Sequence, residues 1–552
     1  MKLELSLVVL LAASSLRASA ASLVARTAAP DVPALPSAVA PQLVSPQAAF
    51  ATAAPAQAAP APAVSAAAQV AAAAAPSAAP GAPQSAEAGA AQAEKVFDDA
   101  DVRGQSVLLV GTRSSRSFIL DETVRVSRAL GLRLFLLDKP ENRQHSKSVV
   151  PDSRFIPAPI DQRDLKTMRS IVVEIGRLAQ QLKLDAVIAF RSHHAKLVGR
   201  LVDALKTVGV PKKAVLTADD KAQTRAVLNT IPGQEVPSRE VRSAAEARRA
   251  FNEMGGGKFV MKTKHGENSR FIQFDLSSEE AVEKAYRKMD AELKAYAKLA
   301  ESSDTIFNRH PGIVLERMLE MAPGTVEASV ELVMQAGKAK LAVVSDTHGI
   351  GPKGEYAGGS MTFPSQQDPK VQSALIQSSI EAVNAVGIKD GNARVDIMMT
   401  PQGPRVIEIN PYMGGAAIFR SVQLVTGESL VEYGIRALLK LKLKAAALNG
   451  TVVDYRFAAS PVTGTLLSVD GLDEAKKMPG VQHLQQLIAV GDRLSAPTGN
   501  GFEEWLEIMG QGATLQEARE NAVKALAKIK FKVRQDDGTI VDASADYLQP
   551  KP

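Results

Sequence analysis

The sequence predicts an α/β domain followed by α+β domains, in a chain of several folded units. Strands and helices alternate between residues 106 and 208, which is the pattern of a parallel sheet with helices on both faces. From about residue 218 this alternation gives way to runs of strands separated by single helices, the pattern of α+β domains. A chain of 552 residues is too long for one hydrophobic core. Its composition, 45% hydrophobic and 22% charged, is that of a globular protein.

The amino-acid composition excludes several classes of function. The chain contains no cysteine, which rules out disulfides, thiolate catalysis and zinc ribbons. A net charge of +6 favours anionic small molecules, but no basic run is interleaved with aromatic residues. We therefore expect no nucleic-acid partner.

The first 95 residues are expected to lie outside the folded domains. Lys2, an apolar run over residues 5–13 and the small residues Ala18-Ser-Ala20 predict a signal peptide over residues 1–20. Ala and Pro dominate residues 21–95, and this composition predicts a disordered tether. We expect export to the periplasm or the cell exterior, or a cytoplasmic protein if the leader is not used. No stretch of the sequence is long and apolar enough to predict a membrane span.

The predicted N-terminal α/β domain contains three buried strands and three helices. The strands are expected at 106–111, 133–138 and 185–190, and the helices at 122–130, 165–182 and 196–208. The loop after the first strand, Thr112–Ser117, lacks a Gly-x-Gly-x-x-Gly pattern. It therefore does not predict a dinucleotide site.

The α+β part of the chain is predicted to extend from residue 218 to the C-terminus. Strands are expected at 258–263, 271–274, 312–317, 327–334 and 339–346, and helices after Asp220 and at 280–300, 371–386 and 430–441. Ser277-Ser-Glu-Glu280 predicts the capped start of the helix at 280–300. The pattern from Tyr455 onward is that of a small β-rich domain, whose last helix, 514–529, opens with a Thr-x-x-Glu cap.

Two β-branched runs around Pro401-Gln-Gly-Pro404 predict a β-hairpin over residues 394–410. Residues that pair in an antiparallel hairpin keep a constant sum of positions, and side chains repeat every second residue. An odd-length loop of three to five residues would therefore place Asp396 opposite Glu408, with Asn410 next on the same face. Carboxylate and amide oxygens of this kind bind Mg²⁺ beside nucleotide phosphates. Taken alone, the hairpin is equally compatible with an exposed wet face of ordinary polar residues.

Four segments, in this order, resemble motifs of the ATP-grasp superfamily, in particular its carboxylate–amine ligases of the L-amino-acid ligase type. The resemblance runs from about residue 106 to about residue 534. The segments are Asp220-Lys-Ala-Gln-Thr-Arg225, Lys258-Phe-Val-Met-Lys262 with His265-Gly-Glu-Asn-Ser269, Ile313-Val-Leu-Glu-Arg-Met-Leu319 with Val326-Glu-Ala-Ser-Val-Glu331, and the hairpin continued by Pro411-Tyr-Met-Gly-Gly415.

This resemblance implies an ATP-grasp fold with an N-terminal parallel-sheet domain, two α+β lobes that clamp ATP, and a small β-rich closing domain. The implied boundaries are 96–217 for the N-terminal domain, 218–318 for the small lobe, 319–449 for the large lobe and 450–552 for the closing domain.

The resemblance also implies ATP and Mg²⁺, or Mn²⁺, as cofactors, and it assigns roles to residues of this chain. The implied metal ligands are Asp396, Glu408 and Asn410. The implied ATP contacts are Lys221, Lys262, the covering-loop residues His265, Gly266 and Ser269, the adenine hinge Glu316, Arg317, Met318 and Leu319, and Glu327 at the ribose. The implied substrate contacts are Glu355, Gly414 and Gly415.

One position departs from the family pattern. The family usually has an arginine where this chain has Tyr412, and that arginine contacts phosphate and the reacting oxygens. Tyrosine carries no charge and cannot form a bidentate pair. Arg394 or Arg420 could supply the missing charge, so we count Lys262, Arg394, Arg420 and Tyr412 as candidate catalytic residues.

The implied function is an ATP-dependent ligase that joins a small-molecule carboxylate to an amine through an acyl phosphate. The alternative is an exported, non-catalytic descendant that keeps the fold and binds a nucleotide or another ligand. A biotin carboxylase-like reaction is disfavoured, because the tether has no Ala-Met-Lys-Met segment to accept biotin. A homodimer is an open expectation.

Overall fold

The structure of the protein is a computed structural model. It describes residues 96–112, 118–160, 165–265, 271–299, 312–350, 356–415, 417–497 and 503–549. The predicted leader, 1–20, and tether, 21–95, lie outside the described residues. Within the described ranges no helix has the length and apolar character needed to cross a membrane.

The N-terminal domain is a parallel four-stranded sheet in the order β3-β2-β1-β4. Its elements are β1 (Ser106–Val110), α2 (Phe118–Ala129), β2 (Arg133–Asp138), α3 (Arg143–Ser146), β3 (Phe155–Pro157), α4 (Leu165–Leu182), β4 (Leu184–Ile188), α5 (Ser192–Leu205) and α6 (Lys212–Asp219). Alternate residues of β1 face opposite layers. Leu109 packs with Leu120 of α2, whereas Leu108 packs with Ile171 of α4 and Leu197 of α5. The prediction of helices on both faces is therefore confirmed.

The small lobe is an antiparallel sheet in the order β5-β8-β6-β7, with two helices on it. Its elements are α7 (Lys221–Leu228), β5 (Ser238–Val241), α8 (Ala244–Glu253), β6 (Phe259–Thr263), β7 (Gln273–Leu276), α9 (Glu279–Leu299) and β8 (Ile313–Arg317). The cap of α9 is shifted by one residue from the prediction, because the Ser278 hydroxyl, rather than that of Ser277, accepts the Ala281 N–H at 3.1 Å.

The large lobe is built on an antiparallel eight-stranded sheet in the order β13-β12-β9-β10-β11-β14-β18-β16. Its elements before residue 450 are β9 (Ala328–Gln335), β10 (Lys338–Ile350), β11 (Tyr356–Phe363), α10 (Pro369–Ala385), β12 (Gly391–Thr400), β13 (Gly403–Asn410), α11 (Ile418–Thr426) and α12 (Leu430–Leu438). Helix α10 covers one face, where Val330 and Val395 are buried against Leu375. Helices α11 and α12 contribute to the apolar core on the other face.

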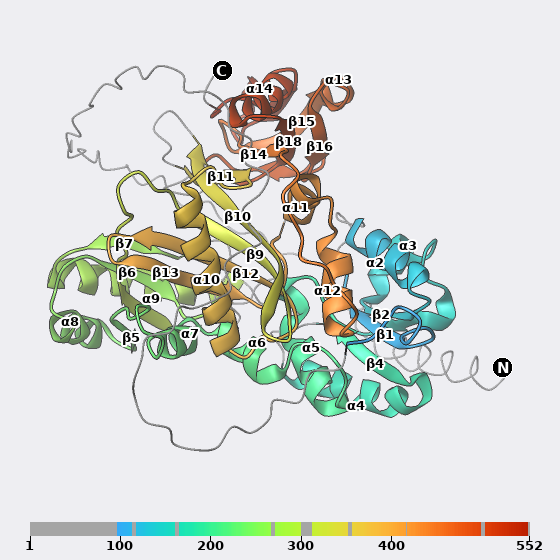
Figure 1. Cartoon of the computed structure of the whole chain (residues 1–552). Helices are drawn as coiled ribbons and strands as arrows, with labels where there is room; N and C mark the ends of the chain where they lie inside the picture. Colours follow the sequence, from blue (N-terminus) through green and yellow to red (C-terminus); the bar gives the residue numbers. More distant parts are fainter. Residues whose placement is uncertain are drawn as a thin grey trace, which may run out of the picture. The chain divides into compact units, whose positions relative to one another are not determined.

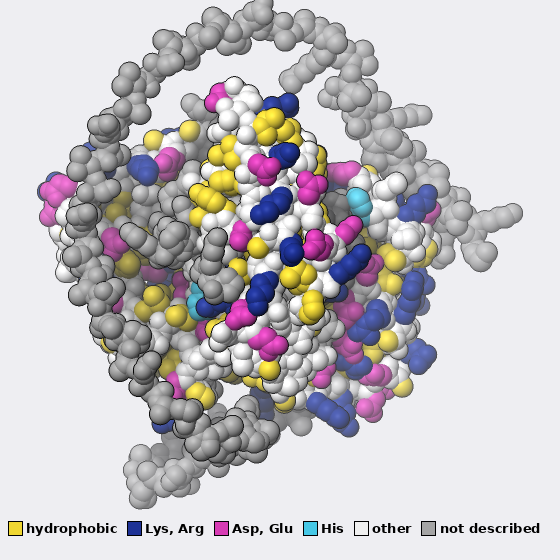
Figure 2. All heavy atoms as spheres, turned by 90° about the horizontal axis from the view of Figure 1, so that it is seen from above, with side chains coloured by type: hydrophobic (Ala, Val, Ile, Leu, Met, Phe, Trp, Pro, Cys, Tyr) yellow, Lys and Arg dark blue, Asp and Glu magenta, His cyan; other side chains and the backbone are white. Residues whose placement is uncertain are grey.

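The C-terminal region continues the sheet of the large lobe (Figure 1). Its elements are β14 (Val452–Ala458), β15 (Gly464–Asp470), α13 (Leu472–Lys476), β16 (Val481–Gln486), β17 (Arg493–Leu494), β18 (Leu506–Gly512), α14 (Leu515–Leu526), β19 (Lys530–Arg534) and β20 (Ile540–Ser544). Strand β14 pairs with β11, and β18 and β16 follow. The remaining strands form a separate sheet in the order β17-β15-β19-β20. Figure 2 shows acidic and basic side chains interspersed over the face that it displays.

A buried ionic network joins the small lobe to the hairpin of the large lobe. Arg225 on α7 donates from Nε to Glu316 Oε2 at 3.0 Å and from Nη2 to the carbonyl of Val406 at 2.8 Å. Lys262 Nζ lies 2.7 Å from the other oxygen, Oε1, of Glu316. Burial opposes the charge on Glu316, but Lys262 and Arg225 outweigh it and lower the pKa of Glu316 to about 2. Burial lowers the pKa of Lys262, although Glu316 counteracts this effect.

We predict that Glu316→Gln lowers the free energy of unfolding by about 3–5 kcal/mol, because it leaves buried cations without their counter-ion. Because the pKa of Glu316 is lowered, its stabilisation is present above pH 4.5 and is lost as the pH falls toward about 2. Urea unfolding across this pH range would measure both effects. Glu520→Gln, in an exposed pair with Lys524, should change little. Equal effects of the two substitutions would contradict the prediction.

The first described residues are held by the large lobe. Phe97 donates its N–H to the Lys440 carbonyl at 2.9 Å and accepts the Lys442 N–H at 3.0 Å. Asp99 pairs with Arg436 through hydrogen bonds of 2.6 and 3.0 Å. The Val102 side chain is only 1% exposed. The chain is therefore anchored from residue 97 onward.

We predict that deletion of residues 1–95 leaves a folded protein with unchanged stability. Deletion of residues 1–102 should lower the free energy of unfolding by about 2 kcal/mol or more, because it removes the buried Val102 and the strand-like contact of Phe97. Urea unfolding of the two truncated proteins measures the difference. Loss of solubility in the shorter deletion would show that residues 1–95 contribute to the fold.

Candidate functional site

The β12–β13 hairpin places the predicted metal ligands on one face. Asp396 lies opposite Glu408, and Arg394 lies opposite Asn410, so the predicted cross-strand pairing is confirmed. The predicted loop length is wrong. Only Pro401 and Gln402 separate the strands, and the register shifts between Asp396 and Ile397. The extra residue of this β-bulge, Ile407, restores the pairing that an odd-length loop would have given.

The side chains around Asp396 leave one of its carboxylate oxygens without a partner. Ser329 on β9 donates its hydroxyl to Asp396 Oδ1 at 2.7 Å, and Arg394 donates from Nε to the same oxygen at 3.2 Å. In the part of the chain that the structure describes, no hydrogen bond or ion pair reaches Oδ2. That oxygen is available to a ligand.

The chemistry of the donor set fits a small divalent cation. Asp396, Glu408 and Asn410 offer carboxylate and amide oxygens on neighbouring positions of two paired strands. Hard oxygen ligands of this type suit Mg²⁺ or Mn²⁺. The described ranges contain no group of three His, Cys, Asp or Glu side chains that could hold a metal without other ligands. The third ligand would therefore have to come from Asn410, a phosphate or water.

The two candidate phosphate-binding lysines differ in their surroundings. Lys221 begins α7, which Asp220 caps, and its Nζ lies 3.4 Å from Glu408 Oε1. It therefore lies beside the candidate metal ligands. Lys262 lies at the end of β6 as predicted, but its ammonium is buried and paired with Glu316. A phosphate at this position would share Lys262 with that carboxylate.

The structure describes the start of the covering loop but not the rest of it, and it does not describe the candidate substrate contact Glu355. Gly266, Ser269 and Glu355 lie outside the described residues. His265 is described, and its Nδ1 lies 2.8 Å from Asp219 Oδ2. Lys196 of α5 also pairs with Asp219 at 2.8 Å. The start of the loop is thus anchored to the end of α6.

In the predicted adenine hinge, some main-chain N–H groups are hydrogen-bonded to other described residues and one is not. The N–H of Arg317 donates to the Pro237 carbonyl at 2.8 Å, and the N–H of Met318 donates to the Lys258 carbonyl at 3.0 Å. For Leu319, no main-chain N–H bond is found to any described residue. Leu319 is therefore the hinge position whose N–H can serve a bound base. The side chain of Glu316 belongs to the buried network instead.

Glu327 lies immediately before β9, and its carbonyl accepts the Thr347 N–H at 2.8 Å. Its side chain remains in contact with solvent. The surrounding protein and the nearby Asp396 carboxylate nevertheless raise its pKa. A carboxylate beside Asp396 is compatible with the ribose contact that the resemblance implies.

The two arginines that could replace the family's missing charge are placed differently. Arg394 donates from Nη1 to Glu331 at 2.7 Å and from Nη2 to the Ser329 hydroxyl at 2.7 Å, in addition to its bond to Asp396. Burial opposes its charge, but Asp396 and Glu331 raise its pKa. Arg420 is exposed on α11, on the side opposite its buried residues. Tyr412 donates its hydroxyl to Asn410 Oδ1 at 2.7 Å.

Glu331 is a residue of this site that the sequence analysis did not identify. Its side chain is fully buried, and its Oε2 accepts the Gly414 N–H at 3.0 Å. Burial raises its pKa, although Arg394 and Gly414 counteract this effect. An available signal was its spacing on β9, two residues after Ser329 and four after Glu327, which places the three residues on one face.

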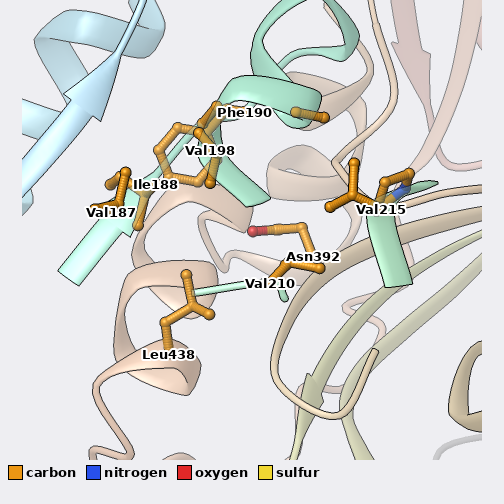
Figure 3. A pocket seen from close by; sticks show the side chains of 11 residues that line it. Val187, Ile188, Phe190, Val198, Val210, Val215, Asn392 and Leu438 are labelled. Atoms are coloured by element: carbon orange, nitrogen blue, oxygen red, sulfur yellow. The ribbon is translucent and has the colours of Figure 1, made fainter. Parts of the chain in front are cut away.

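A small cavity lies beside the segment that follows the hairpin (Figure 3). Phe190 and Val198 of the N-terminal domain line it together with Asn392 of β12, Pro411 and Leu438. Its volume of about 20 Å³ accommodates about one water molecule. It is therefore too small to be the substrate site.

Two family models match the chain. The ATP-grasp domain matches residues 218–416, and the L-amino acid ligase C-terminal domain 2 matches residues 456–534. Carnosine synthase 1 of Mus musculus is 24% identical over 409 residues, which are 72% of this chain and 45% of the mouse protein. The chain thus spans less than half the length of this relative.

Solved structures share the fold. An L-amino acid ligase from Bacillus licheniformis superposes with a TM-score of 0.60 at 18% identity, over 78% of this chain and 100% of that one. The biotin carboxylase domain of Hydrogenobacter thermophilus 2-oxoglutarate carboxylase, in complex with MgADP and bicarbonate, gives a TM-score of 0.57 at 16% identity, over 79% and 91% of the two chains. The chain therefore contains an ATP-grasp domain over residues 218–416, followed by a match to the C-terminal domain 2 of the L-amino acid ligases over residues 456–534.

Proposed function

We propose that the protein is an ATP-dependent carboxylate–amine ligase. A substrate carboxylate oxygen attacks the γ-phosphorus of ATP, which gives an acyl phosphate and ADP. An amine then attacks the acyl carbon, so that a C–N bond forms, the C–O bond to phosphate breaks, and the amine loses a proton. The observation that supports this proposal most strongly is the single face that carries Asp396, Glu408 and Asn410, with Lys221 3.4 Å from Glu408.

The proposed work of the protein is mainly charge neutralisation and positioning. Asp396, Glu408 and Asn410 would hold Mg²⁺ or Mn²⁺, which when bound neutralises the phosphate charge of ATP. Lys221 can approach the same phosphates, because its ammonium already lies beside Glu408. Lys262 would contribute a second positive charge while it remains paired with Glu316.

The remaining ATP contacts follow from the hinge and the covering loop. The Leu319 N–H and the carbonyls of the hinge segment 316–319 would bind the adenine edge. Glu327 would accept hydrogen bonds from the ribose hydroxyls. The main chain around His265, Gly266 and Ser269 would cover the phosphates, since successive backbone N–H groups form anion-binding concavities.

The proposed substrates are L-amino acids or similar small carboxylates and amines. This proposal rests on the match to the L-amino acid ligase C-terminal domain and on relatives named carnosine synthase. Gly414 and Gly415, which follow β13, and Glu355 are proposed substrate contacts. A homodimer is the assembly that we propose to test by light scattering, and a monomeric mass would contradict it.

The ligases and carboxylases named among the relatives and matched structures favour an enzyme over a non-catalytic relic. Export remains a separate proposal that rests on Lys2, the apolar run at 5–13 and Ala18-Ser-Ala20. Mass spectrometry of the mature N-terminus in the native host would show whether residues 1–20 are removed. An intact Met1 in the mature protein would contradict export by this leader.

The experiment that tests the ligase proposal is phosphate release from ATP and Mg²⁺ across pairs of L-amino acids. We expect release that depends on both substrates, together with a dehydrated product detected by mass spectrometry. ATP hydrolysis that does not respond to any carboxylate, or an absence of ATP binding, would contradict a ligase.

We predict that Asp396→Asn and Glu408→Gln each lower the rate of phosphate release by about 10²-fold or more, because a weakened metal site leaves phosphate charge uncompensated. Circular dichroism should show the fold intact in both variants. Glu381→Gln, on the exposed face of α10, is the control and should leave the rate unchanged. Wild-type rates in both site variants would refute the metal assignment.

We predict that Tyr412→Arg raises substrate-dependent phosphate release by up to about 10²-fold. Removal of one hydrogen-bond donor that stabilises a reacting oxyanion costs about 10²-fold in rate in well-studied enzymes, and we expect an added donor to act on the same scale. The reason is that Arg394, the largely buried cation opposite Asn410, is already neutralised by Glu331 and Asp396. Tyr412→Phe is the control, because it removes the hydroxyl that bonds to Asn410 and adds no charge. A slower Tyr412→Arg enzyme would show that the charge at this position is not limiting.

A further inference from the structure

Glu331 joins two parts of the candidate site that are distant in sequence. Its Oε1 accepts from Arg394 Nη1 at 2.7 Å, and its Oε2 accepts from the Gly414 N–H at 3.0 Å. Arg394 belongs to the metal strand β12, and Gly414 belongs to the loop that follows β13. The carboxylate is fully buried, so it has no contact with solvent that could replace either partner.

The contact with Gly414 is too close for any other residue at that position. A Cβ on Gly414 would lie 2.4 Å from Glu331 Oε1 and 2.8 Å from Ile418 Cδ1. The backbone of Gly414 does not have a positive φ, so conformational freedom is not the reason for glycine here. The glycine allows the main-chain N–H to approach the Glu331 carboxylate.

The contact with Arg394 determines which oxygen of Asp396 is available. In the observed arrangement Arg394 gives Nη1 to Glu331 and Nη2 to Ser329, and only Nε reaches Asp396 Oδ1. A guanidinium without its other partners tends to form a bidentate pair with a carboxylate. Such a pair would occupy Asp396 Oδ2, the oxygen that is otherwise available to a metal ion.

We propose that Glu331 is a positioning residue that holds Arg394 away from the metal-binding oxygen of Asp396 and fixes the Gly414 loop beside it. This inference rests on the proposed function, because it assumes that Asp396 binds the metal. Glutamine at position 331 keeps the volume but presents one NH₂ group. That group must face either an Arg394 N–H or the Gly414 N–H. In one of the two contacts, two hydrogen-bond donors would therefore face each other and the bond would be lost.

The test is Mn²⁺ binding to the full chain with ADP present, measured by electron paramagnetic resonance of free Mn²⁺. Glu331→Gln should weaken Mn²⁺ binding by about 10–100-fold, the usual range for residues that orient a ligand. The double variant Glu331→Gln with Arg394→Met should recover part of the affinity, because the competing guanidinium is gone. Gly414→Ala should weaken Mn²⁺ binding as well, because its Cβ displaces Glu331.

The matched control is Asp454→Asn, which removes the charge of another fully buried carboxylate paired with an arginine, Arg456. It should lower the unfolding temperature and leave Mn²⁺ affinity unchanged. Unchanged affinity in Glu331→Gln, or no recovery in the double variant, would overturn the positioning role. Failure of the wild type to bind Mn²⁺ with ADP would instead refute the proposed function, so the two failures are distinguishable.

Discussion

The pairing of β9, β12 and β13 is the constraint on which the candidate site depends. Strand β12 lies between the other two, so its Arg394 and Asp396 are each in register with one residue on either side. Asp396 is opposite both Ser329 and Glu408, and a shift of one residue would turn these side chains toward the apolar layer under α10. Burial of Val395 and Ile397 in that layer therefore fixes the positions of the polar groups on the other face. Hydrophobic packing on one face sets the electrostatics of the other.

Buried Arg225 and largely buried Arg394 show how this protein compensates charges that are withdrawn from water. Arg225 is shared between a carboxylate and a main-chain carbonyl, and Arg394 is shared between two carboxylates and a hydroxyl. A buried charge is tolerated only when its partners compensate the loss of hydration. The same compensation removes Arg394 as a free cation for the reacting oxygens. Compensating charge for the reacting oxygens would then have to come from groups other than Arg394, such as Lys221 beside Glu408.

The sequence predicted the longer strands and helices in order and the opposition of Asp396 and Glu408, because alternation and periodicity are local signals. It did not predict β3, β5, α8 or β11. It did not predict the bulge at Ile407, which depends on the fit of Val406 and Ile409 to the same apolar layer. It also did not show that Lys262 is directed at Glu316 or that Glu331 holds Arg394. These pairs form between strands or helices that only the tertiary structure brings together. Residue type alone could not decide which charges would be neutralised.

The continuity of the eight-stranded sheet restricts how the protein can move. Strand β14 is hydrogen-bonded to β11, so the region matched to the L-amino acid ligase domain shares a hydrogen-bonded framework with the strands that carry Asp396 and Glu408. Hinge rotation between the two would require breaking a run of main-chain hydrogen bonds. The small lobe has its own sheet and is free of this restriction. A displacement of the small lobe would have to break the bond from Arg225 to the Val406 carbonyl, whereas main-chain hydrogen bonds join the C-terminal region to the strands that carry Asp396 and Glu408.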